Sequence, residues 1–376
     1  MPIPIIATGL REGISSIPYA WEILRIAPWV LALAALKYYF EGARNGSERM
    51  MRSKVIMVTG GTSGIGAEVV RELATRGAQR IHRRPPRSHE KPLIYAEQVD
   101  LSSLHSIRTF ATKWIDNIPP RRLDSIILAG GTVEPSSTRP LTTDGIDPEW
   151  QINYLANFHL LSILSPALRA QPAHRDVRVI FATCSSYIGA EFSKLDSVAR
   201  GKQTVMRKRN KTTPGLYAAP KGAYALSKLA LTIFAHSFQR HLNAYTRPDG
   251  LPPCTRVIVV DPGLTRTPGM RRWLTGGSLW GSLGGGGGWL VKECREMDYA
   301  RMDVGNDEVG KRLWEFSERM VEEAEKESAV IRALERKERE GEKVKADAEK
   351  TKTKKDAGLD KGKADGSRRS RKGQNK

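Results

Sequence analysis

A glycine-rich turn directly after a short apolar run is the feature that most constrains how this chain can fold. Residues 55–58 are all apolar, the turn spans residues 59–66, and residues 67–76 have helix-like composition and spacing. Glycines let the backbone turn sharply and approach a phosphate, while the N–H groups and the positive dipole end of a helix face the anion. A strand, a glycine turn and a helix in this order predict a phosphate site, although the glycine spacing alone also occurs in ordinary loops.

A tyrosine and a lysine four residues apart form the second informative pattern. Tyr224 and Lys228 are expected on one face of a helix, because side chains at i and i+4 are neighbours there. A phenol with a pKa of about 10 exchanges protons poorly at neutral pH, so it needs a nearby cation that favours the phenolate. The same pair is common in surface packing, and its order behind the glycine turn is what gives it weight.

These motifs together resemble the short-chain dehydrogenase/reductase family, whose pattern is T-G-x-x-x-G-x-G followed much later by Y-x-x-x-K. The resemblance covers residues 54–317, and residues 288–294 and 313–317 resemble the C-terminal end of the retinol-dehydrogenase-like branch. Strands are expected at residues 177–182 and 256–260. Further family positions follow in the right order, namely the active-site Asn, the catalytic Ser and the turn beside the nicotinamide: Asn153, Ser186, Pro262 and Gly263.

The resemblance implies an α/β fold, a Rossmann-like doubly wound parallel sheet, and NAD(P)-dependent interconversion of a carbonyl and an alcohol. Tyr224 is then the general acid in reduction and the general base in oxidation, while the cofactor carries the hydride. Lys228 supplies the cation and holds the nicotinamide ribose, Ser186 orients the substrate oxygen, and Asn153 holds a water that relays a proton to Lys228. The residues implied to bind the cofactor are Thr59, Gly60, Ser63, Gly64, Ile65, Gly66, Asp100, Lys228, Pro262, Gly263 and Thr267.

Three departures from the family pattern bear on activity rather than on fold. Residues 80–87 combine two prolines with arginines and a histidine, so a basic turn is expected in place of the family's second buried strand. The glycines within residues 267–289 predict a shortened substrate lid, and residues 128–131 lack the family's side-chain amides. Pairing of Arg83 or Arg84 with a 2'-phosphate would favour NADP over NAD, but a solvated basic turn is an equally good interpretation.

An apolar segment precedes the glycine turn. Residues 21–40 are mostly apolar, with aromatic residues near both ends, which suits a membrane interface. The uninterrupted core at residues 26–36 is shorter than the roughly 20 residues that cross a bilayer, so a marginal transmembrane helix and an interfacial helix both stay open. A cleaved signal peptide is the weaker alternative, because Glu12 and Glu22 lie in or before the apolar run. Basic residues follow the segment and place the catalytic domain in the cytosol.

Much of the net charge of +20 lies outside the expected catalytic core. Residues 350–376 hold eleven Lys or Arg against three Asp, which predicts disorder, whereas residues 318–345 predict a helix with i,i+4 charge pairs. A basic cluster within residues 200–211 lacks interleaved aromatics, which argues against nucleic acid and leaves a solvated loop or attraction to anionic lipid. The three cysteines show no metal-ligand or disulfide spacing, so no metal site is predicted.

The chain is therefore expected to comprise a membrane-anchor segment at residues 1–50, a single NAD(P)-binding domain at 51–317 and a charged tail at 318–376. The expected partners are a small lipophilic carbonyl or alcohol substrate and an intracellular membrane, with a homodimer left open. The endoplasmic reticulum, lipid droplets and the mitochondrial outer surface are the candidate membranes. The alternative, motivated by the altered second strand and the shortened lid, is a membrane-tethered and catalytically impaired scaffold or binding protein of the same fold.

Overall fold

The computed structural model describes residues 19–40, 51, 54–76, 79–81, 94–117, 121–134, 138–195, 216–218, 222–263 and 301–369 of the 376-residue chain. Contacts divide the chain into two compact units, Met1–Val321 and Glu322–Lys376. The first unit contains the sheet and all the motifs singled out above, so it is the unit in which a functional site has to be sought.

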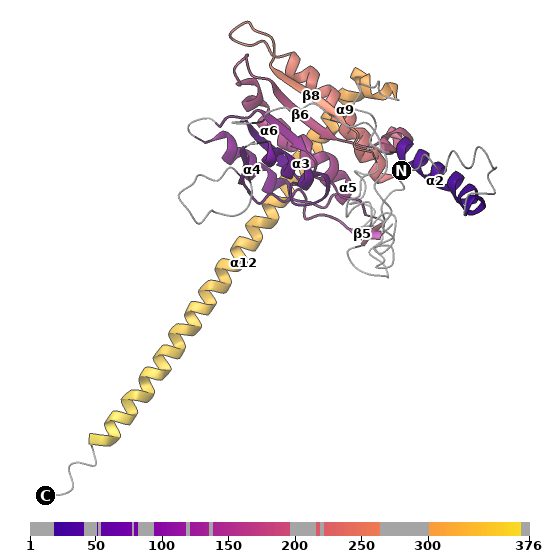
Figure 1. Ribbon diagram of the computed structural model, residues 1–376. Coiled ribbons are helices and arrows are strands. Elements are labelled where there is room, and N and C mark those ends of the chain that lie inside the picture. The colour runs from indigo at the N-terminus through magenta and orange to yellow at the C-terminus, as the bar shows by residue number, and fades with distance from the viewer. Residues whose placement is uncertain are drawn as a thin grey trace, which may run out of the picture. The chain divides into compact units, whose positions relative to one another are not determined.

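A six-stranded parallel sheet forms the centre of the first unit (Figure 1). The strand order is β3-β2-β1-β4-β6-β8, so the chain builds outward from β1 in one direction and then, from β4, in the other. This order confirms the Rossmann-like sheet implied by the family resemblance, and it opens a crevice at the carboxyl ends of β1 and β4. The strands are β1 (Val55–Thr59), β2 (Gln79–Ile81), β3 (Ile94–Tyr95), β4 (Ser125–Leu128), β6 (Val177–Ala182) and β8 (Thr255–Val260).

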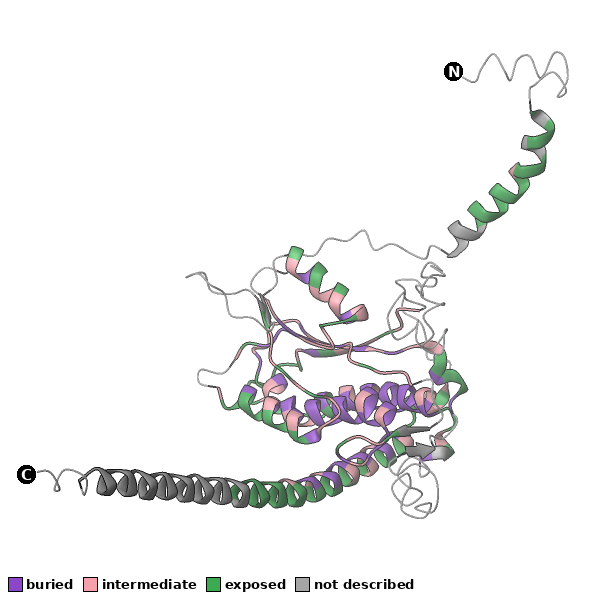
Figure 2. Cartoon of the chain, turned by 90° about the horizontal axis from the view of Figure 1, so that it is seen from below, coloured by how far each residue is buried: buried purple, intermediate pink, exposed green. Residues whose placement is uncertain are grey.

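Helices cover both faces of the sheet (Figure 2). Helix α3 (Gly64–Thr75) lies on one face, and within the described part of the chain it lies there alone. The other face carries α4 (Leu104–Ile115), α6 (Ala156–Arg169) and α9 (Ala223–Asn243). The remaining elements are short: β5 (Thr138–Pro140), which pairs antiparallel with β7 (Leu216–Ala218), α5 (Pro148–Trp150), η2 (Gln151–Leu155), η3 (Ser185–Gly189), η4 (Phe192–Lys194) and η5 (Met302–Gly305).

An aromatic cluster fills the core between the sheet and these helices. The centre of the Phe234 ring in α9 lies 5.1 Å from the ring centre of Phe158 in α6, 6.0 Å from that of Phe181 in β6 and 5.6 Å from that of Trp314. All but Trp314 are at most 2% exposed. Because buried aromatic rings remove a large apolar area from water, this cluster fixes α9, and with it Tyr224 and Lys228, against the sheet.

The second strand departs from its sequence-based prediction. Gln79 pairs with Val55 and Arg80 with Ile56, so residues 80 and 81 lie in a parallel strand, and the expectation of a turn there was wrong. A parallel ladder is made by backbone groups, so a basic side chain does not prevent pairing, and the two prolines come only after the strand. The strand is three residues long, and the rest of the expected basic turn, with Arg83 and Arg84, lies outside the described residues.

The C-terminal tail also differs from expectation. Helix α12 runs from Asp307 to Arg369, so the prediction of disorder was wrong for residues 350–369. That stretch contains no proline, and Lys and Arg, which have good helix propensity, make up eight of its 20 residues. Charge pairs four residues apart, such as Lys326 with Glu322 at 2.7 Å, support the exposed part of the helix.

The N-terminal apolar segment forms helix α2 (Ala20–Phe40), with Pro28 inside it. Trp21 and Trp29 are each 73% exposed, and the side chains around them are mostly exposed as well (Figure 2). None of the helices in the described ranges combines the length and the apolar character that crossing a membrane requires.

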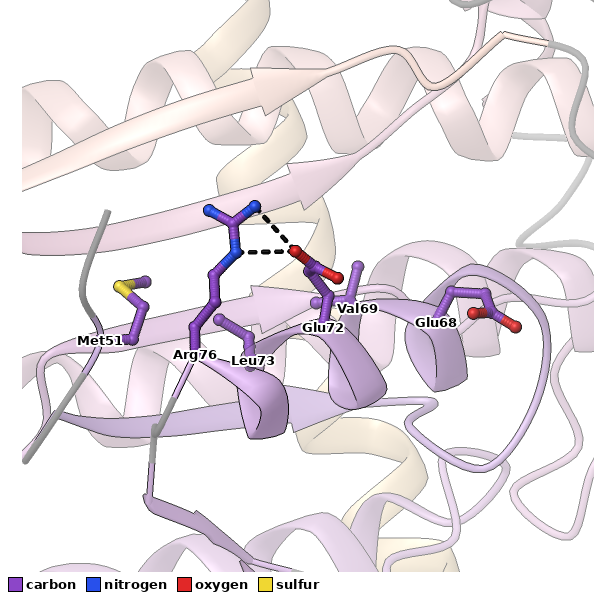
Figure 3. Close-up of a pocket in the computed structure, with 6 residues that line it drawn as sticks. All are labelled: Met51, Glu68, Val69, Glu72, Leu73 and Arg76. Carbon is purple, nitrogen blue, oxygen red and sulfur yellow. Dashed lines mark hydrogen bonds and ion pairs between the residues drawn. The ribbon is translucent and has the colours of Figure 1, made fainter. Parts of the chain in front are cut away.

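A shallow groove of about 420 Å³ lies between Met51 and α3 (Figure 3). Its lining is apolar at Met51, Val69 and Leu73, and Arg76 and Glu72 form an ion pair at 2.7 Å beside it. None of the lining residues belongs to the Tyr-Lys or glycine-turn motifs. The groove is therefore a feature of the helix surface and carries no part of the chemistry considered below.

The buried His159 of α6 gives the fold a pH dependence that can be measured. Burial, with the positive charge of Arg108, lowers the pKa of His159 from 6.5 to about 4. Between these values the unfolded chain binds more protons than the folded chain, so this group's contribution to stability falls as the pH drops from about 6.5 toward 4. At pH 4.5 the loss relative to pH 7 is on the order of 2 kcal/mol.

We expect His159→Gln to flatten the fall in unfolding free energy between pH 7 and pH 4.5, because the amide cannot take up the proton. Urea denaturation at pH 7 and at pH 4.5 measures this difference in unfolding free energy. His174→Gln, at an exposed position, is the matched control and should keep the wild-type pH dependence. Equal pH dependence in the wild type and His159→Gln would contradict the assignment.

Candidate active site

The glycine turn after β1 lies directly against the segment that follows β4. Gly60 has a φ of +68°, and a Cβ atom there would lie 2.6 Å from the Cα of Gly130. The amide N–H of Gly130 donates to Thr59 Oγ1 at 3.3 Å. Any side chain at Gly60 would therefore force apart the two strand ends that border the crevice.

The first turn of α3 fits an anionic group. Gly64 begins the helix with a φ of +57°, and the preceding Ser63 is extended and makes no side-chain cap hydrogen bond. The first backbone N–H groups of the helix, around Ile65, are thus not taken by a cap, and the helix dipole adds positive potential. Gly66 packs directly under the Gly60 carbonyl, where a Cβ atom would have no room. These residues suit the pyrophosphate of a dinucleotide.

Asp100 lies beside the same crevice. Its Oδ1 accepts hydrogen bonds from the backbone N–H of Ser102 at 2.9 Å and from the Ser102 hydroxyl at 2.7 Å. The next residue, Leu101, packs against Gly130, since a Cβ atom at Gly130 would lie 2.6 Å from Leu101 Cδ1. The structure therefore brings Asp100, which the family resemblance implies to bind the cofactor, close to the segment that follows β4.

Asn153 sits in the π-helical turn η2, which joins α5 to α6. Its side chain is fully buried, accepts from the backbone N–H of Thr132 at 2.7 Å, and donates to the Thr132 carbonyl at 3.0 Å and to Ser227 Oγ at 3.2 Å. π-helical turns often mark functional positions because they reorient one residue of a helix. Here the turn aims Asn153 at the segment after β4.

Lys228 reaches the same place from α9. Its side chain is 8% exposed, and its Nζ donates to the Ala182 carbonyl at the end of β6 at 3.2 Å. A Cβ atom at Gly131 would lie 3.1 Å from Asn153 Oδ1 and 3.8 Å from Lys228 Nζ. The two predicted catalytic groups therefore converge on Gly131, where the absence of a Cβ atom leaves room for them.

The electrostatics of the Tyr-Lys pair differ from the simple expectation. Lys228 Nζ lies 5.7 Å from the centre of the Tyr224 ring. Burial raises the pKa of Tyr224, and the neighbouring Cys184, Glu149 and Asp261 raise it further. Burial lowers the pKa of Lys228, while Cys184 and Asp261 act in the opposite direction. In this environment Tyr224 is held in its protonated form, so the nearby cation does not by itself generate a phenolate.

The predicted catalytic Ser186 is exposed and lies in η3, the turn after β6. Its Oγ lies 2.8 Å from Cys184 Sγ, and that sulfur in turn lies 3.5 Å from the Tyr224 hydroxyl. The thiol of Cys184 is thus interposed between the two predicted catalytic hydroxyls. Sequence analysis did not single out Cys184 as a site residue, although its place at the carboxyl end of a central strand was a signal for it.

The turn after β8 closes the site from the other side. Asp261 accepts from the Ser185 hydroxyl at 2.5 Å and from the backbone N–H of Gly263 at 2.9 Å. Gly263 has a φ of +66°, which explains a glycine after Pro262. The sequence did not reveal this link between the two turns. Thr267 and the glycine-rich lid segment lie outside the described residues.

Three comparisons with known proteins agree with this geometry. The family model for short chain dehydrogenase matches residues 54–191, which include the glycine turn, Asn153 and Ser186. An uncharacterized oxidoreductase of Schizosaccharomyces pombe is 33% identical over 87% of this chain and 97% of its own length. Human retinol dehydrogenase 13 is 28% identical over 63% of this chain and 66% of its own length.

Solved structures support the fold. The crystal structure of an uncharacterized protein from Mycobacterium paratuberculosis aligns with a TM-score of 0.50 at 22% identity, covering 75% of this chain and 98% of that chain. The fold, the family model and the nearly full-length relative all agree. The chain belongs to the short-chain dehydrogenase/reductase family of NAD(P)-binding oxidoreductases, and a retinol dehydrogenase is among its relatives.

Proposed function

We propose that this oxidoreductase uses NADP to interconvert a carbonyl and an alcohol on a lipophilic substrate at an intracellular membrane. The observation that carries the chemistry is the convergence of the Asn153 and Lys228 side chains on Gly131. Lys228 lies one turn along helix α9 from Tyr224. A bound nicotinamide cofactor would supply or accept the hydride. The side chains have to move one proton and hold the substrate oxygen.

Tyr224 is the proton donor in reduction. Because burial raises its pKa, the phenol carries its proton across the neutral range, and the Lys228 cation is needed to stabilise the phenolate that forms when the proton is donated. Oxidation uses the reverse transfer, in which the Tyr224 phenolate accepts the proton of the alcohol. Ser186 orients the substrate oxygen, and Lys228 with Asn153 forms the route by which a proton reaches Tyr224.

Two observations support a lipophilic substrate and a membrane. Helix α2 exposes Trp21 and Trp29, whose rings suit the boundary between lipid headgroups and acyl chains. A relative covering nearly two thirds of the chain is named for retinol, a lipophilic alcohol. The interfacial form of the anchor agrees with a helix that contains Pro28.

We expect Tyr224→Phe to abolish turnover and leave cofactor binding largely intact, because it removes the transferable proton but keeps the ring. Lys228→Ala should impair both, since Lys228 is proposed to hold the ribose as well. The measurements are steady-state oxidation of NADPH with a panel of carbonyl compounds and a fluorescence titration of the cofactor. Wild-type rates in Tyr224→Phe would show that another group donates the proton.

Cofactor choice can be tested through salt dependence. We expect a modest preference for NADPH over NADH at low salt that shrinks at high salt. The reason is that ions screen the proposed pairing of Arg83 or Arg84 with the 2'-phosphate. Side-by-side titrations at both salt concentrations measure it. Equal affinities throughout would remove the arginine-phosphate pairing, and no binding of either nucleotide would favour the scaffold alternative.

Deleting residues 1–46 should release the protein from membranes without unfolding the sheet domain, because helix α2 lies before β1. Flotation and carbonate extraction of the full chain and the deletion variant provide the comparison, and cofactor binding reports on folding. Persistent membrane association of the folded deletion variant would move the anchor to another surface, with the basic cluster at residues 200–211 the first to test.

A further inference from the structure

A single arginine far along the chain holds the turn that carries Ser186. Arg301 Nη1 donates to the Ile188 carbonyl at 3.1 Å and also to the Ala190 carbonyl. Its other terminal nitrogen, Nη2, pairs with Asp303. The two carbonyls flank Gly189, the last residue of η3. One guanidinium therefore binds the C-terminal end of this turn, although it lies more than 110 residues away in the sequence.

The turn is also held by its own backbone hydrogen bonds and by packing against α9, where Tyr187 and Ala190 are buried. Within it, the backbone N–H of Tyr187 donates to the Cys184 carbonyl at 3.4 Å, and that of Ala190 donates to the Tyr187 carbonyl at 3.2 Å. The entrance is fixed separately, through the bond from Ser185 to Asp261. The position of the exposed Ser186 between these two ends therefore depends on both Asp261 and Arg301.

The Arg301 side chain is partly buried and is followed by an ordered turn, so its own position is restrained. Its side chain is 22% exposed, so its hydrogen bonds are less screened than those of a surface pair. The residues that follow it form η5, in which Val304 is fully buried. The planar guanidinium can contact two carbonyls and one carboxylate at once, which an ammonium group cannot do with the same geometry.

We propose that Arg301 is a positioning residue for the reaction: by holding the Ile188 and Ala190 carbonyls, it sets Ser186 and Cys184 at the distance from Tyr224 that substrate binding requires. This inference rests on the proposed function, because Ser186 has its role only in carbonyl reduction. A misplacement of about 1 Å in a catalytic group can reduce a rate by about 100-fold, so a remote restraint of this kind has a measurable effect.

The chain supplies a matched control. Arg247 pairs with Asp249 at 2.7 Å, two residues on, and its Nη1 donates to the carbonyls of Gln171 at 2.9 Å and Arg169 at 3.3 Å. The arrangement repeats that of Arg301 and Asp303, but it holds the turn between α6 and β6, away from the catalytic turn. Arg247 Nη1 also lies 4.0 Å from the sulfur of the free Cys254, whereas the free Cys184 directly precedes η3, the turn that Arg301 contacts.

The test compares Arg301→Gln, Arg301→Lys and Arg247→Gln in the full chain. Arg301→Gln should lower kcat by about tenfold, equal to about 1.4 kcal/mol, with little change in cofactor affinity. Arg301→Lys should give a kcat between those of the wild type and Arg301→Gln, because it keeps the positive charge but loses the planar guanidinium that contacts both carbonyls. Arg247→Gln should lower the melting temperature at least as much as Arg301→Gln and leave kcat unchanged.

A second readout does not depend on turnover. Alkylation by iodoacetamide, followed for each cysteine by peptide mass spectrometry, should become several-fold faster at Cys184 in Arg301→Gln and stay unchanged at Cys254. Arg247→Gln should show the reverse. If Cys184 reacts at the wild-type rate in Arg301→Gln, Arg301 does not hold the turn and the proposal is wrong.

The remaining outcomes are equally decisive. A faster reaction at Cys184 with an unchanged kcat would mean that the turn is held but catalysis does not need it, which overturns the positioning role. An equal fall of kcat in Arg247→Gln would reduce the effect to general stability. If the wild type turns over no carbonyl compound although Arg301→Gln loosens Cys184, the proposed function fails and the restraint on the turn stands.

Discussion

Close backbone contact between Gly60 and Gly130 is the constraint on which the rest of this structure depends. It brings the turn after β1 and the segment after β4 together, and these two strand ends border the crevice of a doubly wound sheet. The neighbouring Gly131 is where Asn153 and Lys228 meet. Three glycines thus serve both halves of the candidate site, the predicted phosphate-binding turn and the proposed proton route, because only residues without a Cβ atom allow the backbones and side chains to approach so closely.

Burial acts on the two members of the Tyr-Lys pair in opposite directions. It raises the pKa of Tyr224 and lowers that of Lys228, and both shifts favour the uncharged forms. The nearby Asp261 counteracts the effect at Lys228 but reinforces it at Tyr224. A carboxylate at the end of β8 therefore helps to keep a cation at Lys228 and a proton on Tyr224, which is the arrangement that reduction of a carbonyl requires.

Local patterns predicted much of this fold, and long-range pairing accounts for what they missed. The order of apolar run, glycines and helix predicted β1 and α3, and the spacing of Tyr224 and Lys228 placed them on one helix, α9. Strand β2 was missed because backbone pairing tolerates arginine side chains. The extent of α12 was missed because a charged composition was interpreted as disorder although it also suits an exposed helix.

The least predictable contacts are those that join turns distant in sequence. Asp261 reaches Ser185 across 76 positions and Arg301 reaches Ile188 across 113, and neither pair produces a periodicity or a motif. Both act on the same turn, one at its entrance and one at its exit. Since a loop loses more conformational entropy the more firmly both ends are fixed, a turn held in this way is ordered before substrate arrives. In the proposed mechanism, pre-ordering of Ser186 is thus set by contacts between distant residues rather than by the local sequence around it.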